Sequence, residues 1–213
     1  MNEIIKLYDY VRDDDLNLCF SDGVAYQVDR KDHNDYNGKY YTHCLEKYTD
    51  EKMKAAINKG RIEFVWKHFG RDTVLDIGVG AGDFIKAHGN ADGYDVDKEA
   101  VKWLKDNFLY SKKFKNYDAF TMWDVLEHVL RPEKYFKHMR KGSTLFLSIP
   151  IFKDLTKVRE SKHYRPGEHW YYFTENGLIN FLGKYGFILI EKSDFEKKAG
   201  REQIYNFALG RVY

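Results

Sequence analysis

The sequence has little of several features that mark particular protein classes. Its two cysteines, Cys19 and Cys44, form no CxxC motif, so they cannot build a zinc site by themselves and we expect free thiols. No run of about 18 apolar residues occurs and the N-terminus has no apolar signal core, which favours a cytoplasmic protein without a membrane partner. The net charge is only +2, from 35 basic and 33 acidic residues, so the basic footprint of a dedicated nucleic-acid binder is missing.

Proline is also scarce, with three residues, and no Gly/Ser-rich linker divides the chain. The 213 residues suit one domain with decoration and can bury a core without disulfides or structural metal. With 43% hydrophobic and 32% charged residues, the composition is that of a soluble globular protein.

Residues 1–48 differ in character from the rest of the chain. Asp22-Gly23 lies between two apolar runs within residues 16–28, which predicts a β-hairpin. The polar stretch 29–48 is rich in tyrosine, and we predict that it forms a lid that shapes the functional site; a packed cap without ligand contact is the alternative. The tyrosines expected to form the lid are Tyr36, Tyr40, Tyr41 and Tyr48 of this stretch together with Tyr26 of the hairpin.

The remaining residues, 49–213, alternate between short apolar strands and helical segments. We predict strands over 73–78, 92–96, 117–123, 143–150, 186–191 and 205–212, and helices over 51–69, 83–88, 98–108, 175–185 and from Pro132 onward. The stretch from 151 to Tyr172 is expected to be a polar, aromatic loop. This alternation predicts a doubly wound, mostly parallel α/β sheet. The last strand should be antiparallel because its connection is too short for a parallel crossover.

A glycine turn follows the first strand of this domain, in the segment VLDIGVGAGDF. Gly78, Gly80 and Gly82 allow a sharp turn and a close approach of the backbone to a ligand. The dinucleotide fingerprint GxGxxG fails here, because Asp83 occupies the sixth position. With Asp76 also beside the turn, the site favours a ligand without phosphates and with cationic character.

Asp95 ends the second predicted strand, 19 residues after Asp76. A carboxylate can accept two hydrogen bonds, so Asp95 suits the paired hydroxyls of a ribose. Residues 96–117 must then hold both a helix and the usual third strand. Because LYSKKF is a poor strand sequence, we expect the third strand to be truncated.

The ordered set VLDIGVGAGDF, GYDVDKEAV and YDAFTMWDVLEHV resembles the class I S-adenosylmethionine-dependent methyltransferases. The group that includes ubiquinone-biosynthesis O-methyltransferases and sugar methyltransferases looks most similar, over about Thr73 to Tyr213. The resemblance implies a Rossmann-like fold, S-adenosylmethionine as cofactor and S-adenosylhomocysteine as product. It also implies that the cofactor contacts Asp76, Gly78, Gly80, Gly82, Asp95, Val96, Trp123 and Asp124. Within this set, Asp76 supports the methionine amino group, Asp95 the ribose and Val96 the adenine, while Trp123 and Asp124 flank the methyl group.

Methyl transfer to a hydroxyl or amine also needs a group that accepts a proton. The candidates are His128, His169 and Asp124, with His163 as a further histidine. His128 follows a strand end, where active-site groups gather in this fold. Each histidine also has a structural interpretation, as a helix-capping or a hydrogen-bonded loop residue.

The alternative is that the segment DVLEH binds a divalent metal ion. Asp124 and Glu127 are three residues apart and can share a helix face, and some relatives, such as small-RNA 2′-O-methyltransferases, ligate a metal with a similar pattern and a downstream histidine. His163 or His169 would serve as that histidine here. We nevertheless favour a site without metal, since metal-free relatives carry similar pairs.

The sequence therefore predicts a methyltransferase that acts on an oxygen, nitrogen or carbon atom of a small molecule. A non-catalytic module that binds an adenosine ligand and a nucleic-acid methyltransferase are the alternatives. Against the latter, the sequence has no NPPY-like motif and no catalytic cysteine motif.

Overall fold

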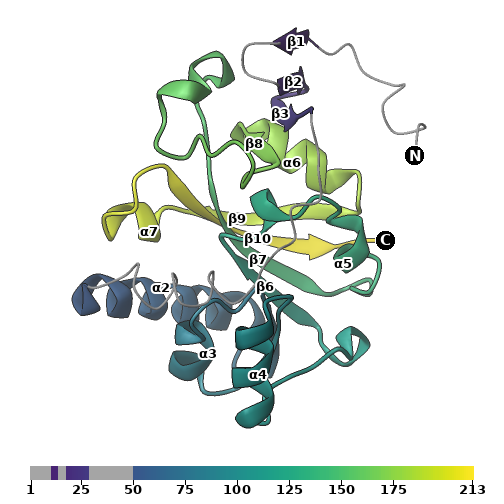
Figure 1. Cartoon of the computed structure of the whole chain (residues 1–213). Coiled ribbons are helices and arrows are strands. Elements are labelled where there is room, and N and C mark those ends of the chain that lie inside the picture. Colours follow the sequence, from purple (N-terminus) through teal and green to yellow (C-terminus); the bar gives the residue numbers. More distant parts are fainter. Residues whose placement is uncertain (1–10, 14–17, 29–49) are drawn as a thin grey trace.

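Six strands form the main sheet of the protein in the order β5-β4-β6-β7-β10-β9 (Figure 1). The structure is a computed structural model that describes residues 11–13, 18–28 and 50–213. The strands are β4 (Val74–Ile77), β5 (Ala91–Tyr94), β6 (Ala119–Trp123), β7 (Thr144–Pro150), β9 (Phe187–Ser193) and β10 (Ile204–Arg211). Strands β5, β4, β6 and β7 pair in parallel, whereas β10 is antiparallel to both β7 and β9. This topology confirms the predicted mostly parallel sheet with an antiparallel last strand.

Helices lie against this sheet (Figure 1), and some of them begin at capping side chains. They are α2 (Glu51–Phe69), α3 (Asp83–His88), α4 (Lys98–Asp106), α5 (Glu133–Phe136), α6 (Glu175–Gly183) and α7 (Phe195–Lys198). Asp50, Asp97 and Thr174 each accept hydrogen bonds from the first N–H groups of α2, α4 and α6, which otherwise lack intrahelical partners. None of the helices in the described ranges is both long and apolar enough to cross a membrane.

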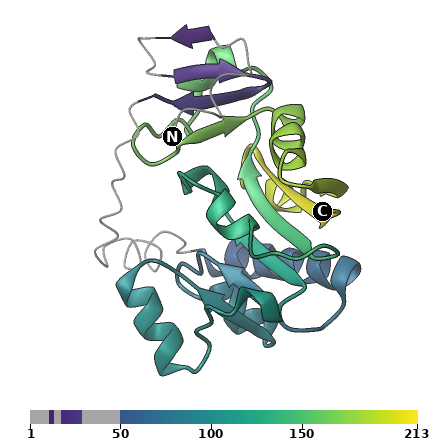
Figure 2. The ribbon, with the colours of Figure 1, turned by 90° about the vertical axis from the view of Figure 1, so that its right-hand side faces the viewer.

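A second, smaller sheet has the order β1-β2-β3-β8 and lies above the main sheet in Figure 2. Its strands are β1 (Val11–Asp13), β2 (Leu18–Ser21), β3 (Val24–Gln27) and β8 (Tyr171–Phe173). The predicted hairpin is confirmed: β2 and β3 are antiparallel, and Asp22 and Gly23 both have positive φ, as a tight I′ turn requires.

Strand β8 is a correction to the sequence analysis, which treats residues up to Tyr172 as loop. Pairing of β3 with β8 supplies the backbone partners that make Tyr171–Phe173 a strand. Of the predicted lid tyrosines, Tyr26 packs edge-on against Tyr171, with ring centroids 5.6 Å apart. The other four lie outside the described residues, so the lid and the division at residue 48 stay predictions.

The expected truncation of the third strand is also seen. Within the described residues 95–118, the chain forms α4, a single bridge from Gly93 to Tyr110 and the 3₁₀ turn η2 (Phe114–Asn116). The lysine-rich sequence there cannot fill a strand buried on both faces. Tyr110 instead stacks on Tyr94, with centroids 6.3 Å apart, and β5 forms the edge of the sheet.

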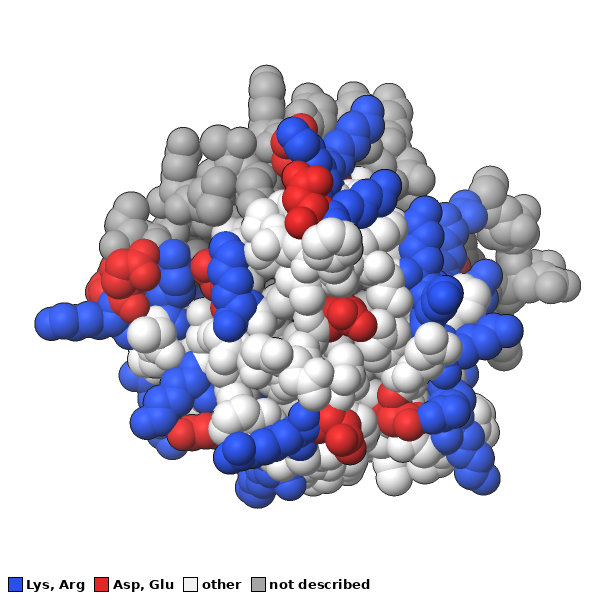
Figure 3. Space-filling model, turned by 90° about the horizontal axis from the view of Figure 1, so that it is seen from below, with Lys and Arg blue, Asp and Glu red and all other residues white. Residues whose placement is uncertain are grey.

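Buried apolar side chains from both faces of the main sheet form the core, among them Leu75, Phe120, Met122, Leu147 and Phe207. Strands β4, β6 and β7 are buried along their whole length, as expected for parallel strands covered on both faces. On the face seen from below, lysines and arginines lie around the margin with acidic side chains among them, and the centre is largely uncharged (Figure 3). Because β5, β4 and β6 are neighbouring parallel strands, their carboxyl ends meet at one edge of the sheet. The predicted site residues lie at this edge.

Candidate active site

A cavity lies at the carboxyl ends of β4, β5 and β6, between α2 and α5. Its wall combines the glycine turn, the end of β5, the end of β6 and the following turn. The predicted site residues that line it are Asp76, Gly78, Gly80, Asp95, Val96, Trp123, Asp124 and His128. Two predicted site residues, Gly82 and His169, are not part of this wall.

The glycine turn after β4 adopts the backbone conformation that only glycine takes without strain. Gly78, Gly80 and Gly82 have φ values of +77°, +52° and +75°. A Cβ atom on Gly78 would lie 2.5 Å from the Val125 side chain, so the glycine permits the close approach of the turn after β6. A Cβ on Gly82 would lie 2.5 Å from Trp103, which shows that this glycine packs against α4 rather than against the cavity.

Asp76 is the penultimate residue of β4 and is only 1% exposed. It accepts a hydrogen bond from Thr121 Oγ1 at 2.5 Å. Burial raises the pKa of Asp76 to about 7, although the bond from Thr121 and the charge of Arg61 act in the opposite direction. Near neutral pH this carboxyl group is therefore poised between its neutral and its charged form.

Asp95 is held in place by the backbone. Its Oδ1 accepts from the N–H groups of Val96 at 2.7 Å and Asp97 at 2.8 Å, and the N–H of Val79 also bonds the carboxylate. Burial raises the pKa of Asp95, and these N–H groups oppose the shift. The neighbouring Val96 side chain is 51% exposed and faces the cavity. An oriented carboxylate beside an exposed apolar side chain fits a ribose next to an adenine.

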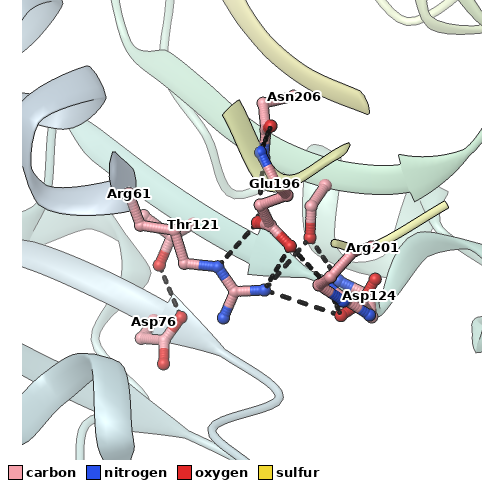
Figure 4. A network of polar contacts seen from close by, with 8 residues as sticks. Arg61, Asp76, Thr121, Asp124, Glu196, Arg201 and Asn206 are labelled. Carbon is pink, nitrogen blue, oxygen red and sulfur yellow. Dashed lines mark hydrogen bonds and ion pairs between the residues drawn. The ribbon is translucent and has the colours of Figure 1, made fainter. Parts of the chain in front are cut away.

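Trp123 and Asp124 lie at the end of β6, on the opposite side of the glycine turn from Asp95. Asp124 has a φ of +56°, in the left-handed region that non-glycine residues rarely adopt. Its N–H donates to Ser148 O at 3.0 Å on β7, and its Oδ2 accepts from Arg201 Nη1 at 2.7 Å. The Arg61 guanidinium lies 3.5 Å from the same oxygen (Figure 4). It also lies 4.9 Å above the Trp123 ring.

These arginines share a second carboxylate, that of Glu196, which is fully buried on α7. Glu196 accepts from Arg61 Nε at 2.8 Å, from Asn206 Nδ2 at 2.9 Å and also from Arg201 (Figure 4). The network joins α2, α7 and β10 to the end of β6. Arg61, Glu196 and Arg201 could not be singled out from the sequence, because isolated charged residues look like surface residues until the fold brings them together.

The three candidate histidines occupy different environments. His128 is half-buried and lines the cavity, and its Nδ1 lies 3.1 Å from the carbonyl oxygen of Glu168. His169 is 4% exposed and meets the His128 ring edge-on, with centroids 4.5 Å apart. Burial, with the neighbouring His128, lowers the pKa of His169 to about 2, so it is neutral. His163 instead bonds the Glu202 carbonyl oxygen at 2.9 Å, outside the cavity wall.

Among the described residues, a group that could hold a metal ion consists of Glu127, His128 and His169, whose ligand atoms lie within 4.8 Å of one another. The expected pairing of Asp124 with Glu127 on one helix face is wrong. Residues Leu126–His128 form the 3₁₀ turn η3, and Asp124 precedes it with a left-handed backbone and bonds Arg201.

Comparison with known proteins agrees with this geometry. Residues 45–192 match the family model described as a methyltransferase domain. A search of curated proteins found no match.

Solved structures share the fold at low sequence identity. A SAM-dependent methyltransferase from Archaeoglobus fulgidus has a TM-score of 0.55 and 17% identity, over 81% of this chain and all of that one. The 1,6-didemethyltoxoflavin-N1-methyltransferase of Burkholderia thailandensis, with bound S-adenosylhomocysteine, has a TM-score of 0.55 and 14% identity, over 97% and 99% of the two chains. The magnesium protoporphyrin IX methyltransferase of Synechocystis PCC 6803 has a TM-score of 0.54 and 16% identity, over 84% and 97%.

The chain belongs to the class I S-adenosylmethionine-dependent methyltransferases, as its sequence predicts. It is therefore a methyltransferase enzyme, and S-adenosylmethionine is its cofactor. The matches do not separate the ubiquinone-biosynthesis and sugar methyltransferase group from other members, so that finer placement stays a prediction.

Proposed function

We propose that this enzyme transfers the methyl group of S-adenosylmethionine to an oxygen, nitrogen or carbon atom of a small molecule. The observation that carries the proposal is one cavity whose wall contains Asp76 and Asp95 on one side and Trp123 and His128 on the other. A cofactor held by the carboxylates would present its methyl group to an acceptor beside His128. Holding both reactants in this geometry supplies about 7–11 kcal/mol of the barrier reduction.

The cofactor side of the cavity suits this ligand chemically. Gly78 and Gly80 let the backbone lie close to the methionine part, while the acidic Asp76 favours its amino group. Asp95, oriented by three N–H groups, is placed to accept from the ribose hydroxyls, and Val96 offers an apolar contact to the adenine. A turn that binds phosphate offers free N–H groups and little negative charge, whereas carboxylates lie beside this one. The site therefore suits a ligand that carries positive charge and no phosphate.

His128 is the group that we assign as proton acceptor. Because a carbonyl oxygen can only accept, the Glu168 contact assigns the proton to Nδ1 and the lone pair to Nε2. The Asp124 carboxylate accepts a hydrogen bond from Arg201 and also lies 3.5 Å from Arg61, so we assign it a role in shaping the methyl end. His169, neutral and edge-on to the His128 ring, positions that ring.

The reaction breaks the bond between the cofactor sulfur and its methyl carbon, forms a bond from that carbon to the acceptor, and releases S-adenosylhomocysteine. For a hydroxyl or amine acceptor, the proton moves to His128 Nε2. We expect His128→Ala to lower kcat by about 10²–10⁴-fold with little change in cofactor affinity. His163→Ala is the matched control, since His163 lies outside the cavity wall. Equal activity of the two variants would exclude His128 as the base.

A screen of methyl acceptors, read out as S-adenosylhomocysteine release, tests the function as a whole. The set contains phenols, sugars, amines, carbon acids and short RNA and DNA. Turnover of a small molecule supports the proposal, and turnover of nucleic acid alone refutes it. Tight cofactor binding in calorimetry without turnover of any acceptor points to a non-catalytic binding module.

A further inference from the structure

Phe108 is the most exposed large apolar side chain among the described residues, at 95%. It follows the C-terminal end of α4, and its φ of +60° lies in the left-handed region. The N–H of Phe108 donates to the carbonyl oxygen of Lys105 at 3.1 Å, and the N–H of Leu109 donates to that of Leu104 at 2.8 Å. Glycine is the usual residue at this position of a helix cap. A phenylalanine strains the backbone there and leaves its ring in water, which folding alone does not explain.

Positive charge is concentrated in the same segment of the chain. Residues 98–115 contain six lysines and two acidic residues, which gives this segment a net charge of +4, whereas the whole chain has +2. The rest of the chain therefore has a net negative charge. All six lysines of the segment are exposed. Such an asymmetry within a nearly neutral protein indicates that this surface meets an anionic partner.

Three of these lysines share one face of α4. Lys98, Lys102 and Lys105 are four and three residues apart, a spacing that places their side chains on one side of the helix and brings like charges close together. Together with Lys112 they line a groove that adjoins the cofactor cavity at Asp95. The repulsion among the lysines destabilises the free helix, and an anionic surface opposite them would relieve it.

The aromatic rings of this segment distinguish a lipid surface from a nucleic acid. Tyr110 stacks on Tyr94, and the Nζ atoms of Lys105 and Lys112 lie 5.5 and 5.8 Å from the centroid of its ring. Its ring is therefore in contact with the protein's own side chains, whereas proteins that bind single strands offer their rings to the bases. The ring that projects is Phe108. A projecting apolar ring among lysines suits a bilayer, where the ring enters the acyl boundary and the lysines meet anionic headgroups.

We infer that the C-terminal end of α4 is a docking patch for an anionic phospholipid surface. The docking patch consists of Phe108, Lys98, Lys102, Lys105 and Lys112. The sequence analysis expects no membrane partner because no long apolar run occurs, but peripheral docking needs only an exposed apolar anchor and basic side chains. In both views α4 lies at the end of the molecule away from the small sheet (Figures 1 and 2), so docking leaves the small sheet directed away from the lipid. On the face at this end, lysines and arginines surround a largely uncharged centre (Figure 3).

Flotation of the full-length, tag-free protein with lipid vesicles tests the docking patch. Vesicles of phosphatidylcholine alone are compared with vesicles that contain about 30% phosphatidylglycerol, at about 0.1 M and about 0.5 M NaCl. One variant is Phe108→Gly, because glycine removes the ring and adopts the left-handed cap without strain. The other variant combines Lys105→Gln with Lys112→Gln. Its matched control combines Lys153→Gln with Lys157→Gln, which removes the same charge at exposed positions outside the patch.

The wild type is expected to float with the anionic vesicles only, and less so at the higher salt concentration. Phe108→Gly should lower the partition coefficient about fivefold without lowering Tm, which a merely structural role of Phe108 would not produce. The double lysine variant should lower it more than about tenfold, while the control pair binds like the wild type. Absence of wild-type binding to anionic vesicles, equal binding of Phe108→Gly and the wild type, or binding to short RNA or DNA in place of vesicles would overturn the inference.

Discussion

Protonation of Asp76 is expected to control how tightly the enzyme binds its cofactor. The buried carboxyl group has a pKa of about 7, raised by burial against the opposing effects of Thr121 and Arg61, while the nearby Asp95 adds to the increase. A cofactor whose positively charged amino group contacts Asp76 binds the ionised form. Binding at a pH below 7 must therefore remove a proton from Asp76, and the free energy of that step is lost from the affinity.

The size of the effect follows from the ionised fraction. With a pKa of about 7, roughly three quarters of Asp76 is ionised at about pH 7.5 and roughly 3% at about pH 5.5, so the affinity should fall about 25-fold between them. Calorimetric titration with S-adenosylhomocysteine, which has the amino group and no methyl group to transfer, measures this directly. Repeating it in buffers of different ionisation enthalpy counts the proton released.

Two variants make this prediction specific. Asp76→Asn should bind more weakly at about pH 7.5 but should lose most of the decline toward low pH, because nothing at this position then titrates. Thr121→Val removes the hydrogen bond that lowers the pKa of Asp76, so the decline should begin at a higher pH. An unchanged decline in Asp76→Asn would assign the titration to other groups, such as Asp95, and would refute the reasoning.

Two further predictions concern the ribose contact and the glycine turn. Asp95→Ala should weaken S-adenosylhomocysteine binding by about 10–100-fold in calorimetry, since hydrogen bonds to a charged group contribute about 1.5–3 kcal/mol each. The control is Glu99→Ala, at an exposed position on α4. An unchanged affinity of Asp95→Ala would rule out its ribose role. Gly82→Ala should lower the free energy of unfolding in urea by about 2–4 kcal/mol, from left-handed strain and the clash with Trp103. Gly89→Ala has the same φ of +75° with no atom within 4 Å of its Cβ, so it should lose only about 1–2 kcal/mol, and an equal loss in both would show that the Trp103 contact is unimportant.

Much of the cofactor side of the site could be predicted from the sequence, because it is built from consecutive strand ends. Asp76 lies near the end of β4, Gly78 and Asp95 directly follow β4 and β5, and parallel strands place their carboxyl ends at one edge. The truncated third strand was predictable for the same local reason, since a lysine-rich segment cannot form a buried strand. Gly82 differs from the prediction, because it packs against Trp103 rather than lining the cavity. That contact depends on how α4 packs and is not visible in the sequence.

The methyl end could not be predicted in this way, because it depends on residues that meet only after folding. Glu196 looks like a surface residue in a short charged helix, yet packing of α7 on α2 buries it completely beside Arg61. The two histidines were separate candidates in the sequence. Their contact results from β8, a strand that forms by pairing with β3 far away in the sequence.

The division of the described residues into two sheets has a consequence for how this enzyme can diversify. The proposed cofactor contacts belong to the six-stranded sheet, while the four-stranded sheet approaches the cavity through residues 126–130, which bond Trp170 and Tyr171. Substitutions or insertions in β1–β3 and β8 can therefore reshape the acceptor side without touching the ends of β4 and β5. Libraries confined to the small sheet should yield variants with altered acceptor preference and unchanged cofactor affinity, which makes this sheet the natural starting point for engineering.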